Sequence, residues 1–293
     1  MYRGALYTSL NILYIWFVND IIIVNYIMYG GNIMEVNNMK ICGGVNPINL
    51  KKVCVIPSRY KSTRFEGKPL MDICGHPMVW WVYQEALKVK DFDEVVVATE
   101  DSRVKDVCDN NNMKCILTSD NCPTGTDRVC EVAKLIDADY YYVLMGDEPL
   151  LTINEINAMV NALNEDPAPA ALLATKFHSP VDVVNNSTIK LALNLKNDLI
   201  YMSRSPIPYP KGALNYDYYK NVGLYVFSKE CLKQFENTPM GRMESIEQLE
   251  MLRILENHIR CKAVVVETDA MSVDTYKDLL RIREIMKKRI NSK

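Results

Sequence analysis

Short apolar runs alternate with helix-like segments from residue 52 onward, and this alternation constrains the fold more than any other feature of the chain. The runs expected to be strands are 53–56, 94–99, 114–118 and 140–145, and the expected helices are 76–89, 102–111 (starting at a Ser102 cap) and 126–137. Buried strands of four to six residues joined by helices predict a mostly parallel sheet covered on both faces. Right-handed crossovers then give a doubly wound α/β sheet.

The pattern changes after a helix at 152–163 and the break at Pro167-Ala168-Pro169. The later expected elements are strands 170–177, 189–195, 220–227 and 262–266, and helices 246–256 and 274–288. Prolines and loops separate the middle strands. We therefore expect residues 51–293 to form one domain with an inserted smaller lobe at about 178–245.

Composition excludes several functional classes. The formal net charge of -2 does not favour a nucleic-acid binder. Nine cysteines without CxxC pairs, and three histidines without metal-ligand spacing, do not favour a zinc site. Reduced thiols in the cytoplasm fit this usage best.

The first fifty residues differ from the rest. Residues 5–18 and 21–29 are strongly apolar, but Asn19-Asp20 separates them, and an acidic residue near the centre of a membrane helix is costly. Three interpretations stay open: a weak membrane anchor, a loosely docked or disordered leader, or sequence upstream of the true start. We favour the third, with Met34 or Met39 as the start, so membrane contact is expected only if the leader is real.

A cationic loop at 57–70 directly follows the first strand. It carries two arginines, two lysines, hydroxyl groups and Gly67, the composition that a polyphosphate site requires. A solvated basic turn is the alternative. Ligands of such sheets bind outside the carboxyl ends of the strands, where Gly146-Asp147-Glu148-Pro149 should also lie.

Asp147 at a strand end suits a magnesium ion that bridges phosphates, and this ion needs a second acid from elsewhere. Asp274 is the best candidate, with helix capping as the alternative role. The turn at 124–128 could present backbone donors to a nucleobase or ribose, or could simply cap a helix. On the helix at 246–256, a solvated face is the default interpretation.

The ordered set of motifs closely resembles the 3-deoxy-manno-octulosonate (Kdo) cytidylyltransferases, the CMP-Kdo synthetases. The resemblance runs from about Lys52 to Lys288 and rests on these segments: 57–59, 62–64, 67–70, 125–128, 146–149, 203–208, 223–225, 247–253 and 273–275. It implies a fold of the nucleotide-diphospho-sugar transferase type and commonly a homodimer. The implied reaction couples CTP to a 2-keto-3-deoxy sugar acid, releases pyrophosphate and serves lipopolysaccharide or cell-surface polysaccharide biosynthesis.

The same resemblance implies roles for individual residues. Arg59, Lys68 and Asp147 would be catalytic, and Asp147 and Asp274 would hold Mg²⁺. The residues implied for CTP are Ser58, Arg59, Arg64, Lys68, Thr126, Arg128 and Gly146, and those for the sugar acid are Arg204, Asn221, Glu247 and Glu250.

Three departures fall mainly where the base or sugar is read. Met145 replaces the usual Gln, Asn221 replaces a His, and Cys122-Pro123-Thr124 replaces His-Gln-Ser. CTP-dependent transfer is therefore better supported than Kdo itself as the acceptor. An amino-modified Kdo or a nonulosonic acid is the alternative acceptor. Two further alternatives are a sugar-1-phosphate nucleotidyltransferase and a nucleotide-binding protein without turnover.

Overall fold

The structure is a computed structural model that describes residues 13–18, 21–29, 32–35, 50–61, 65–212 and 216–292. The chain divides into two compact units, residues 1–49 and 50–293. In the first, β1 (Leu13–Val18), β2 (Ile21–Tyr29) and β3 (Asn32–Glu35) form an antiparallel sheet. Within the described residues, no helix has the length and apolar character needed to cross a membrane. The candidate start Met39 lies outside the described residues.

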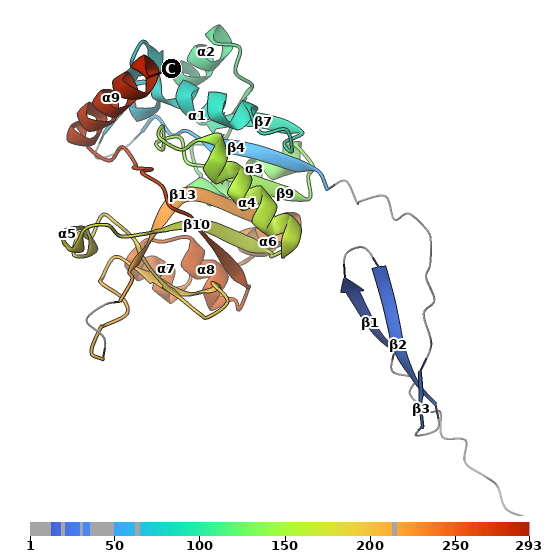
Figure 1. The fold of residues 1–293 in the computed structure, drawn as a ribbon. Coiled ribbons are helices and arrows are strands. Elements are labelled where there is room, and N and C mark those ends of the chain that lie inside the picture. Colours follow the sequence, from blue (N-terminus) through green and yellow to red (C-terminus); the bar gives the residue numbers. More distant parts are fainter. Residues whose placement is uncertain are drawn as a thin grey trace, which may run out of the picture. The chain divides into compact units, whose positions relative to one another are not determined.

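A nine-stranded sheet runs through the second unit (Figure 1). Its main path has the order β12-β11-β13-β9-β4-β7-β8, while β10 pairs with β13 and β14. The bounds are β4 (Lys52–Pro57), β7 (Glu94–Thr99), β8 (Cys115–Leu117), β9 (Tyr140–Leu144), β10 (Ala170–Lys176), β11 (Lys190–Leu193), β12 (Leu199–Ser203), β13 (Tyr219–Ser228) and β14 (Cys261–Val265). The predicted parallel pairing is confirmed for β8, β7, β4 and β9, whereas β13 runs antiparallel to β9, β10 and β11.

Helices cover both faces of this sheet, as predicted. Along β4, Cys54 and Ile56 pack with α1 (Met78–Leu87) and α4 (Ile153–Glu165), whereas Val53 and Val55 pack with α3 (Gly125–Leu135) and α6 (Lys229–Asn237). This alternation follows from the two-residue period of a strand, and it buries an apolar side chain at every position from 53 to 56.

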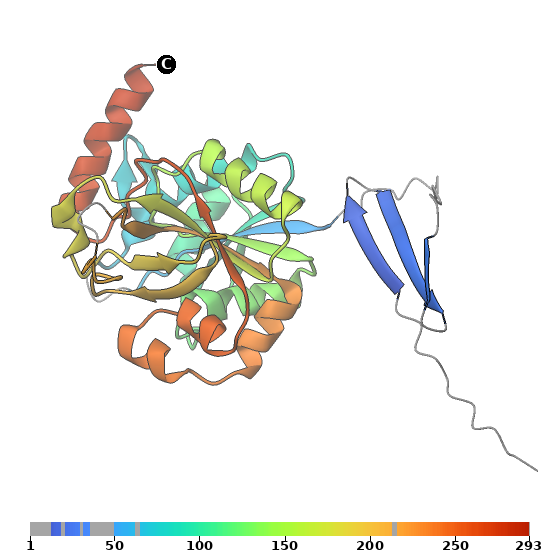
Figure 2. The same cartoon turned by 60° about the horizontal axis from the view of Figure 1, so that its bottom comes forward.

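The closing helix forms a third apolar cluster. Helix α9 (Tyr276–Asn291) packs Leu279 and Ile282 against Ile73 and Met78, and it extends away from the rest of this unit to the C-terminus (Figure 2). The remaining elements are α2 (Ser102–Asn110), η1 (Lys68–Leu70), β5 (Asp72–Ile73), β6 (His76–Pro77), α5 (Pro180–Val183), α7 (Arg242–Glu247) and α8 (Met251–Glu256).

Several boundaries correct the sequence predictions. Helix α2 is capped by the carboxylate of Asp101, which accepts the N–H of Arg103, so the predicted cap at Ser102 is wrong. The single helix predicted over 246–256 is two helices, because Gln248 adopts a left-handed conformation (φ 54°) that ends α7. Strand β12 and helix α6 are not among the elements that the sequence predicts, although residues 199–202 of β12 form a short apolar run.

The solvated face expected near this break is also wrong. Arg253 donates two hydrogen bonds of 2.6 Å to the carboxylate of Glu244, and its guanidinium lies 3.9 Å from the ring centroid of Phe235. Both charged side chains are buried. The pair joins α7 to α8 where the backbone between them turns.

We expect Glu244→Ala to lower the free energy of unfolding by about 3 to 5 kcal/mol, because it leaves a buried guanidinium without its partner. Glu284→Ala is the matched control, since its contact with Lys287 is 3.8 Å long and both side chains are well exposed. Urea denaturation of both variants measures the difference. Equal midpoints would contradict a stabilising role for the buried pair.

Candidate active site at the carboxyl ends of the parallel strands

A cleft of about 280 Å³ opens where the parallel strands end. Its lining is Pro57, Ser58, Arg59, Lys61, Lys68, Pro69, Thr124, Gly125, Arg128, Met145, Gly146 and Asp147. Backbone hydrogen bonds from Ser58 to Ala98 and from Thr118 to Thr99 hold the ends of β4, β7 and β8 together. The cationic loop and the Gly146-Asp147 turn therefore meet at one edge of the sheet, as the strand order requires.

The first turn of the cationic loop uses its backbone donors internally. The N–H groups of Tyr60 and Lys61 donate to Oε1 of Glu100, over 3.0 and 3.3 Å. These two donors are therefore not directed at the cleft in this structure. The side chains of this turn carry the positive charge of the cleft instead. Arg64 lies outside the described residues.

Lys68 connects two segments at the side of the cleft where Asp147 lies. Its ammonium group donates to Oδ2 of Asp147 over 2.5 Å and to the carbonyl of Val273 over 2.9 Å. The N–H of Val273 donates to the carbonyl of Asp147 over 2.9 Å. These contacts bring the segment that carries Asp274 to the turn that carries Asp147.

Asp274 does not cap the closing helix. The cap of α9 is Thr275, which shares a reciprocal capping box with Asp278, so the alternative of a plain capping role for Asp274 is wrong. Within the described residues, no group of three or more histidines, cysteines, aspartates or glutamates could hold a metal ion. A site built on Asp147 and Asp274 would have to draw its other ligands from substrate and water.

The start of α3 differs from its expected role. Thr124 forms a capping box with Asp127, which confirms the capping alternative. The N–H groups of Gly125 and Thr126 and the hydroxyl of Thr126 all donate to the carboxylate of Glu250. These backbone donors are therefore not directed at a nucleobase in this structure. Burial raises the pKa of the Glu250 carboxyl.

Arg128 lines the cleft, but it is not a free cation. Its side chain is only 2% exposed, and its Nη2 lies 3.0 Å from Oε2 of Glu100. Its Nη1 donates to the hydroxyl of Thr118. The guanidinium thus joins α3 to the ends of β7 and β8.

Glu148 is a buried acid for which the sequence predicts no role. Its Oε1 accepts the hydroxyl of Ser272 over 2.5 Å and the N–H of Gly223 over 3.2 Å. Its Oε2 is buried without a hydrogen-bond partner among the described residues. Burial, with the nearby charge of Asp147, raises the pKa of the Glu148 carboxyl to about 7.

Two glycines provide space around these acids. A β-carbon at Gly223 would lie 2.6 Å from Cγ of Glu148, and one at Gly146 would lie 2.6 Å from Oγ of Ser58. Both distances are too short for any side chain without displacement of the neighbour. The absence of a side chain at these two positions therefore lets the ends of β4, β9 and β13 approach each other.

The residues expected at the sugar acid are held in the lobe, outside the lining of the cleft. Arg204 donates through Nε to the carbonyl of Glu247 and through Nη1 to that of Asn186, over 2.9 and 3.3 Å. The Glu247 carboxylate accepts the hydroxyl of Ser203 and the N–H of Arg204. Asn221 donates to the hydroxyl of Tyr225 over 2.6 Å, and its Oδ1 is buried without a partner among the described residues.

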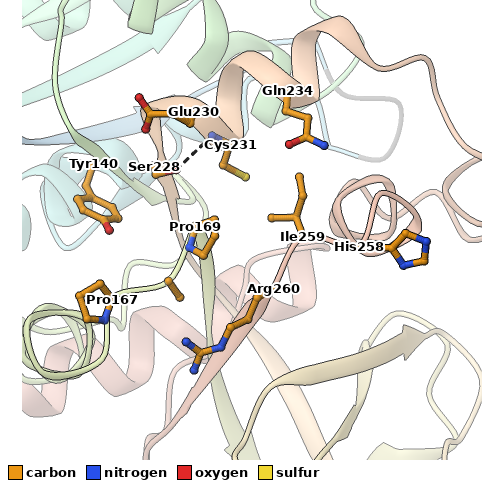
Figure 3. A pocket seen from close by; sticks show the side chains of 11 residues that line it. Tyr140, Pro167, Pro169, Ser228, Glu230, Cys231, Gln234, His258, Ile259 and Arg260 are labelled. Carbon is orange, nitrogen blue, oxygen red and sulfur yellow. Dashed lines mark hydrogen bonds between the residues drawn. The ribbon is translucent and has the colours of Figure 1, made fainter. Parts of the chain in front are cut away.

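A larger hollow of about 510 Å³ lies at the opposite edge, where β9, β10 and β14 begin. Figure 3 shows Glu230, Cys231 and Gln234 on one side and Arg260 on the other. Arg260 is engaged by Asp166 and Asp198. The smaller cleft is the better candidate site, because it lies at the carboxyl ends of the parallel strands and is lined by Arg59, Lys68 and Asp147.

The sheet, the cationic loop and the Gly146-Asp147 turn at its edge are typical of a nucleotidyltransferase of the nucleotide-sugar type. The model of the cytidylyltransferase family matches residues 53–274. The chain is 38% identical to the 3-deoxy-manno-octulosonate cytidylyltransferase of Escherichia coli over 233 residues, which is 79% of this chain and 94% of that protein. It is 36% identical to the enzyme of the same name from Chloroherpeton thalassium over 240 residues, 80% and 98% of the two chains.

Solved structures agree with the sequence matches. A CMP-2-keto-3-deoxy-manno-octonic acid synthetase in complex with CTP is 38% identical, with a TM-score of 0.78 over 82% of this chain and 99% of that one. A 4-diphosphocytidyl-2C-methyl-D-erythritol synthase from Anaerococcus prevotii shares the fold alone, with 14% identity and a TM-score of 0.57 over 82% and 97% of the chains. The chain belongs to the cytidylyltransferase family, and within it to the 3-deoxy-manno-octulosonate cytidylyltransferases.

Because Glu148 is buried, we expect the stability of the protein to depend on pH when divalent cations are removed. The Glu148 pKa of about 7 in the folded state lies above the ordinary 4.5. The stabilising contribution is therefore complete below pH 4.5 and is lost as the pH rises towards 7, by about 3 kcal/mol. Glu148→Gln should gain stability relative to the unchanged protein between pH 5 and about pH 8. Thermal unfolding in EDTA measures this, and a pH-independent difference would contradict it.

Proposed function

We propose that this protein transfers CMP from CTP to 3-deoxy-D-manno-octulosonate and releases pyrophosphate. The observation that carries the proposal is the contact of Lys68 with both Asp147 and the 272–274 segment at the sheet edge. The match to Kdo cytidylyltransferases over most of the chain supplies the reaction class. The product would be the activated sugar for lipopolysaccharide or cell-surface polysaccharide synthesis.

The chemistry requires charge neutralisation and alignment more than a covalent nucleophile. The anomeric hydroxyl of the sugar attacks the α-phosphorus of CTP, and the bond to the pyrophosphate oxygen breaks. Arg59, Lys61 and Lys68 line the cleft and would offset the charge of the triphosphate. Ser58 and Gly146 would form its floor, since the missing side chain at Gly146 lets the two segments approach closely.

The two acids fit a magnesium ion. One or two carboxylates, with phosphate oxygens and water, form the ligand set that Mg²⁺ prefers, and Asp147 and Asp274 provide such a pair on adjoining segments. When bound, Mg²⁺ would stabilise the charge that develops at the α-phosphate and lower the pKa of the attacking hydroxyl. Lys68 already contacts Asp147, so it would remain beside the phosphates and hold that carboxylate in place.

The acceptor would bind on the lobe side. Arg204 keeps N–H groups beyond the two that donate to carbonyls, and a guanidinium suits the carboxylate of a sugar acid. Asn221 has a buried oxygen without a partner among the described residues, and a hydroxyl or amino group of the sugar could donate to it. An amino-modified Kdo or a nonulosonic acid is therefore the alternative acceptor.

An acceptor panel tests the proposed reaction. Purified protein, CTP and Mg²⁺ are incubated with Kdo, amino-modified Kdo, a nonulosonic acid or a sugar 1-phosphate, and pyrophosphate release is measured. Turnover is expected with Kdo and with CTP in preference to ATP, GTP and UTP. Absence of turnover with all the acids, together with absence of CTP binding, would refute the proposal.

We expect Asp147→Asn to abolish turnover with little loss of stability, because the side chain keeps its volume but loses the charge that binds a cation. Pyrophosphate release and thermal unfolding of the same preparation give the two readouts. Asp137→Asn is the control, because Asp137 pairs with Lys229 and does not line the cleft. Near-normal activity of Asp147→Asn would refute the metal assignment.

We also propose a cytoplasmic homodimer that does not bind nucleic acid. The eight cysteines within the described residues are free, which suits a reducing compartment. Strand β12 lies at an edge of the sheet, and Ile200, Met243 and Ile246 are exposed beside it. Tyr201 of β12 contacts Met243 of α7 over 3.7 Å, so these apolar side chains lie on adjoining elements and form one candidate interface.

Ile246→Glu should convert the dimer to a monomer, because it places a charge within the apolar patch. Leu135→Glu is the control, since Leu135 is 68% exposed on α3, outside the patch. Sedimentation equilibrium measures the mass. A monomeric unchanged protein, or a dimer that survives Ile246→Glu, would refute the interface.

A further inference from the structure

Glu100 lies directly under the cationic loop, where a negative charge would normally oppose phosphate binding. It follows β7 and is 2% exposed in its side chain. Its Oε1 accepts the N–H groups of both Tyr60 and Lys61. A single buried carboxylate oxygen thus fixes two successive peptide groups of the loop.

The charge of Glu100 is balanced from beneath the cleft. Nη2 of Arg128 lies 3.0 Å from the other carboxylate oxygen, and the Arg128 side chain is equally buried. A second Arg128 nitrogen donates to Thr118, beyond the end of β8. Because the ion pair is neutral as a unit, it can hold the loop without repelling a triphosphate.

The loop turn depends on this pair for its shape. Arg59 donates through Nε to the carbonyl of Lys61 over 2.8 Å, so the conformation of residues 60–61 sets the direction of the Arg59 side chain. The N–H of Gly67 donates to the carbonyl of Tyr60, and Gly67 adopts a left-handed φ of 68° immediately before Lys68. A shift of Tyr60 would therefore move Arg59 and Lys68, two of the cations that line the cleft.

From these contacts we infer that Glu100 is a positioning residue for the triphosphate of CTP. It acts through the backbone of Tyr60 and Lys61, and Arg128 serves as its counter-ion and not as a free phosphate ligand. The inference rests on the proposed role of the loop in binding CTP. It predicts that loss of Glu100 weakens the binding of every ligand that carries the β- and γ-phosphates. The binding of a ligand that lacks them should not change.

The test compares CTP, pyrophosphate and CMP on the full chain. Glu100→Ala removes the acceptor that fixes the N–H groups of Tyr60 and Lys61, so the KM for CTP and the inhibition constant of pyrophosphate should each rise about ten- to hundredfold. The inhibition constant of CMP and the KM for Kdo should not change. Glu100→Gln keeps an oxygen for the two N–H groups but loses the ion pair, so it should show a smaller rise in the same two constants.

Two controls separate the outcomes. Glu244→Gln breaks a second buried ion pair, neither member of which lines the cleft, and should lower stability while leaving the KM for CTP unchanged. Lys68→Ala tests the loop itself: if its KM for CTP does not rise, the proposed role of the loop fails. If it rises while folded Glu100→Gln and Glu100→Ala bind CTP and pyrophosphate normally, the positioning role alone is refuted. An equal loss for CMP would also refute it.

Discussion

The ammonium group of Lys68 holds together segments that are far apart in the chain. Its two acceptors are Asp147 and Val273, which follow it by 79 and 205 residues. One is a carboxylate and the other a neutral carbonyl, so the site keeps a positively charged group against the acid on which the proposed metal binding depends. The meeting of loop, strand end and closing segment follows from the parallel strand order, because that order places all the carboxyl ends at one edge.

Internal carboxylates satisfy the backbone donors at this edge. Glu100 binds the cationic loop, Glu250 binds the start of α3, and Glu247 binds the peptide of Arg204. Such donors are common anion sites in other phosphate-binding proteins. Here they stabilise the protein itself, and the positive charge of the cleft comes from side chains. This arrangement suits a loop without a glycine-rich motif. A loop whose N–H groups are held by a carboxylate does not need the backbone freedom that glycines supply.

Much of the fold could be predicted because short buried strands leave a strong signal. Residues 53–57 of β4 are all apolar, and the alternation of strands with helices predicts the parallel pairing of β8, β7, β4 and β9. The lobe could not be predicted as well, because β12 is an edge strand with exposed residues and the break at Gln248 depends on tertiary contacts. A left-handed residue that is not glycine leaves no mark in the sequence.

The site could be predicted in its position but not in its internal pairing. Asp147 and Lys68 were recognisable because both follow strands or stand in a motif. Arg128 was expected near phosphates, and its partner Glu100 was overlooked, although Glu100 stands directly after a predicted strand. Two opposite charges that pair at a separation of 28 residues cannot be identified from one sequence. A buried, paired glutamate or arginine is written with the same letter as an exposed one.

Gly223 limits how the proposed acceptor pocket could be redesigned. A side chain there would collide with the stem of Glu148, which also holds the closing segment through Ser272. Combinatorial libraries that aim to change sugar preference should therefore leave this position untouched and diversify its neighbour Asn221. If both positions were randomised together, changes in selectivity could not be separated from disruption of the sheet edge. Most variants would then be inactive before any new substrate could be tested.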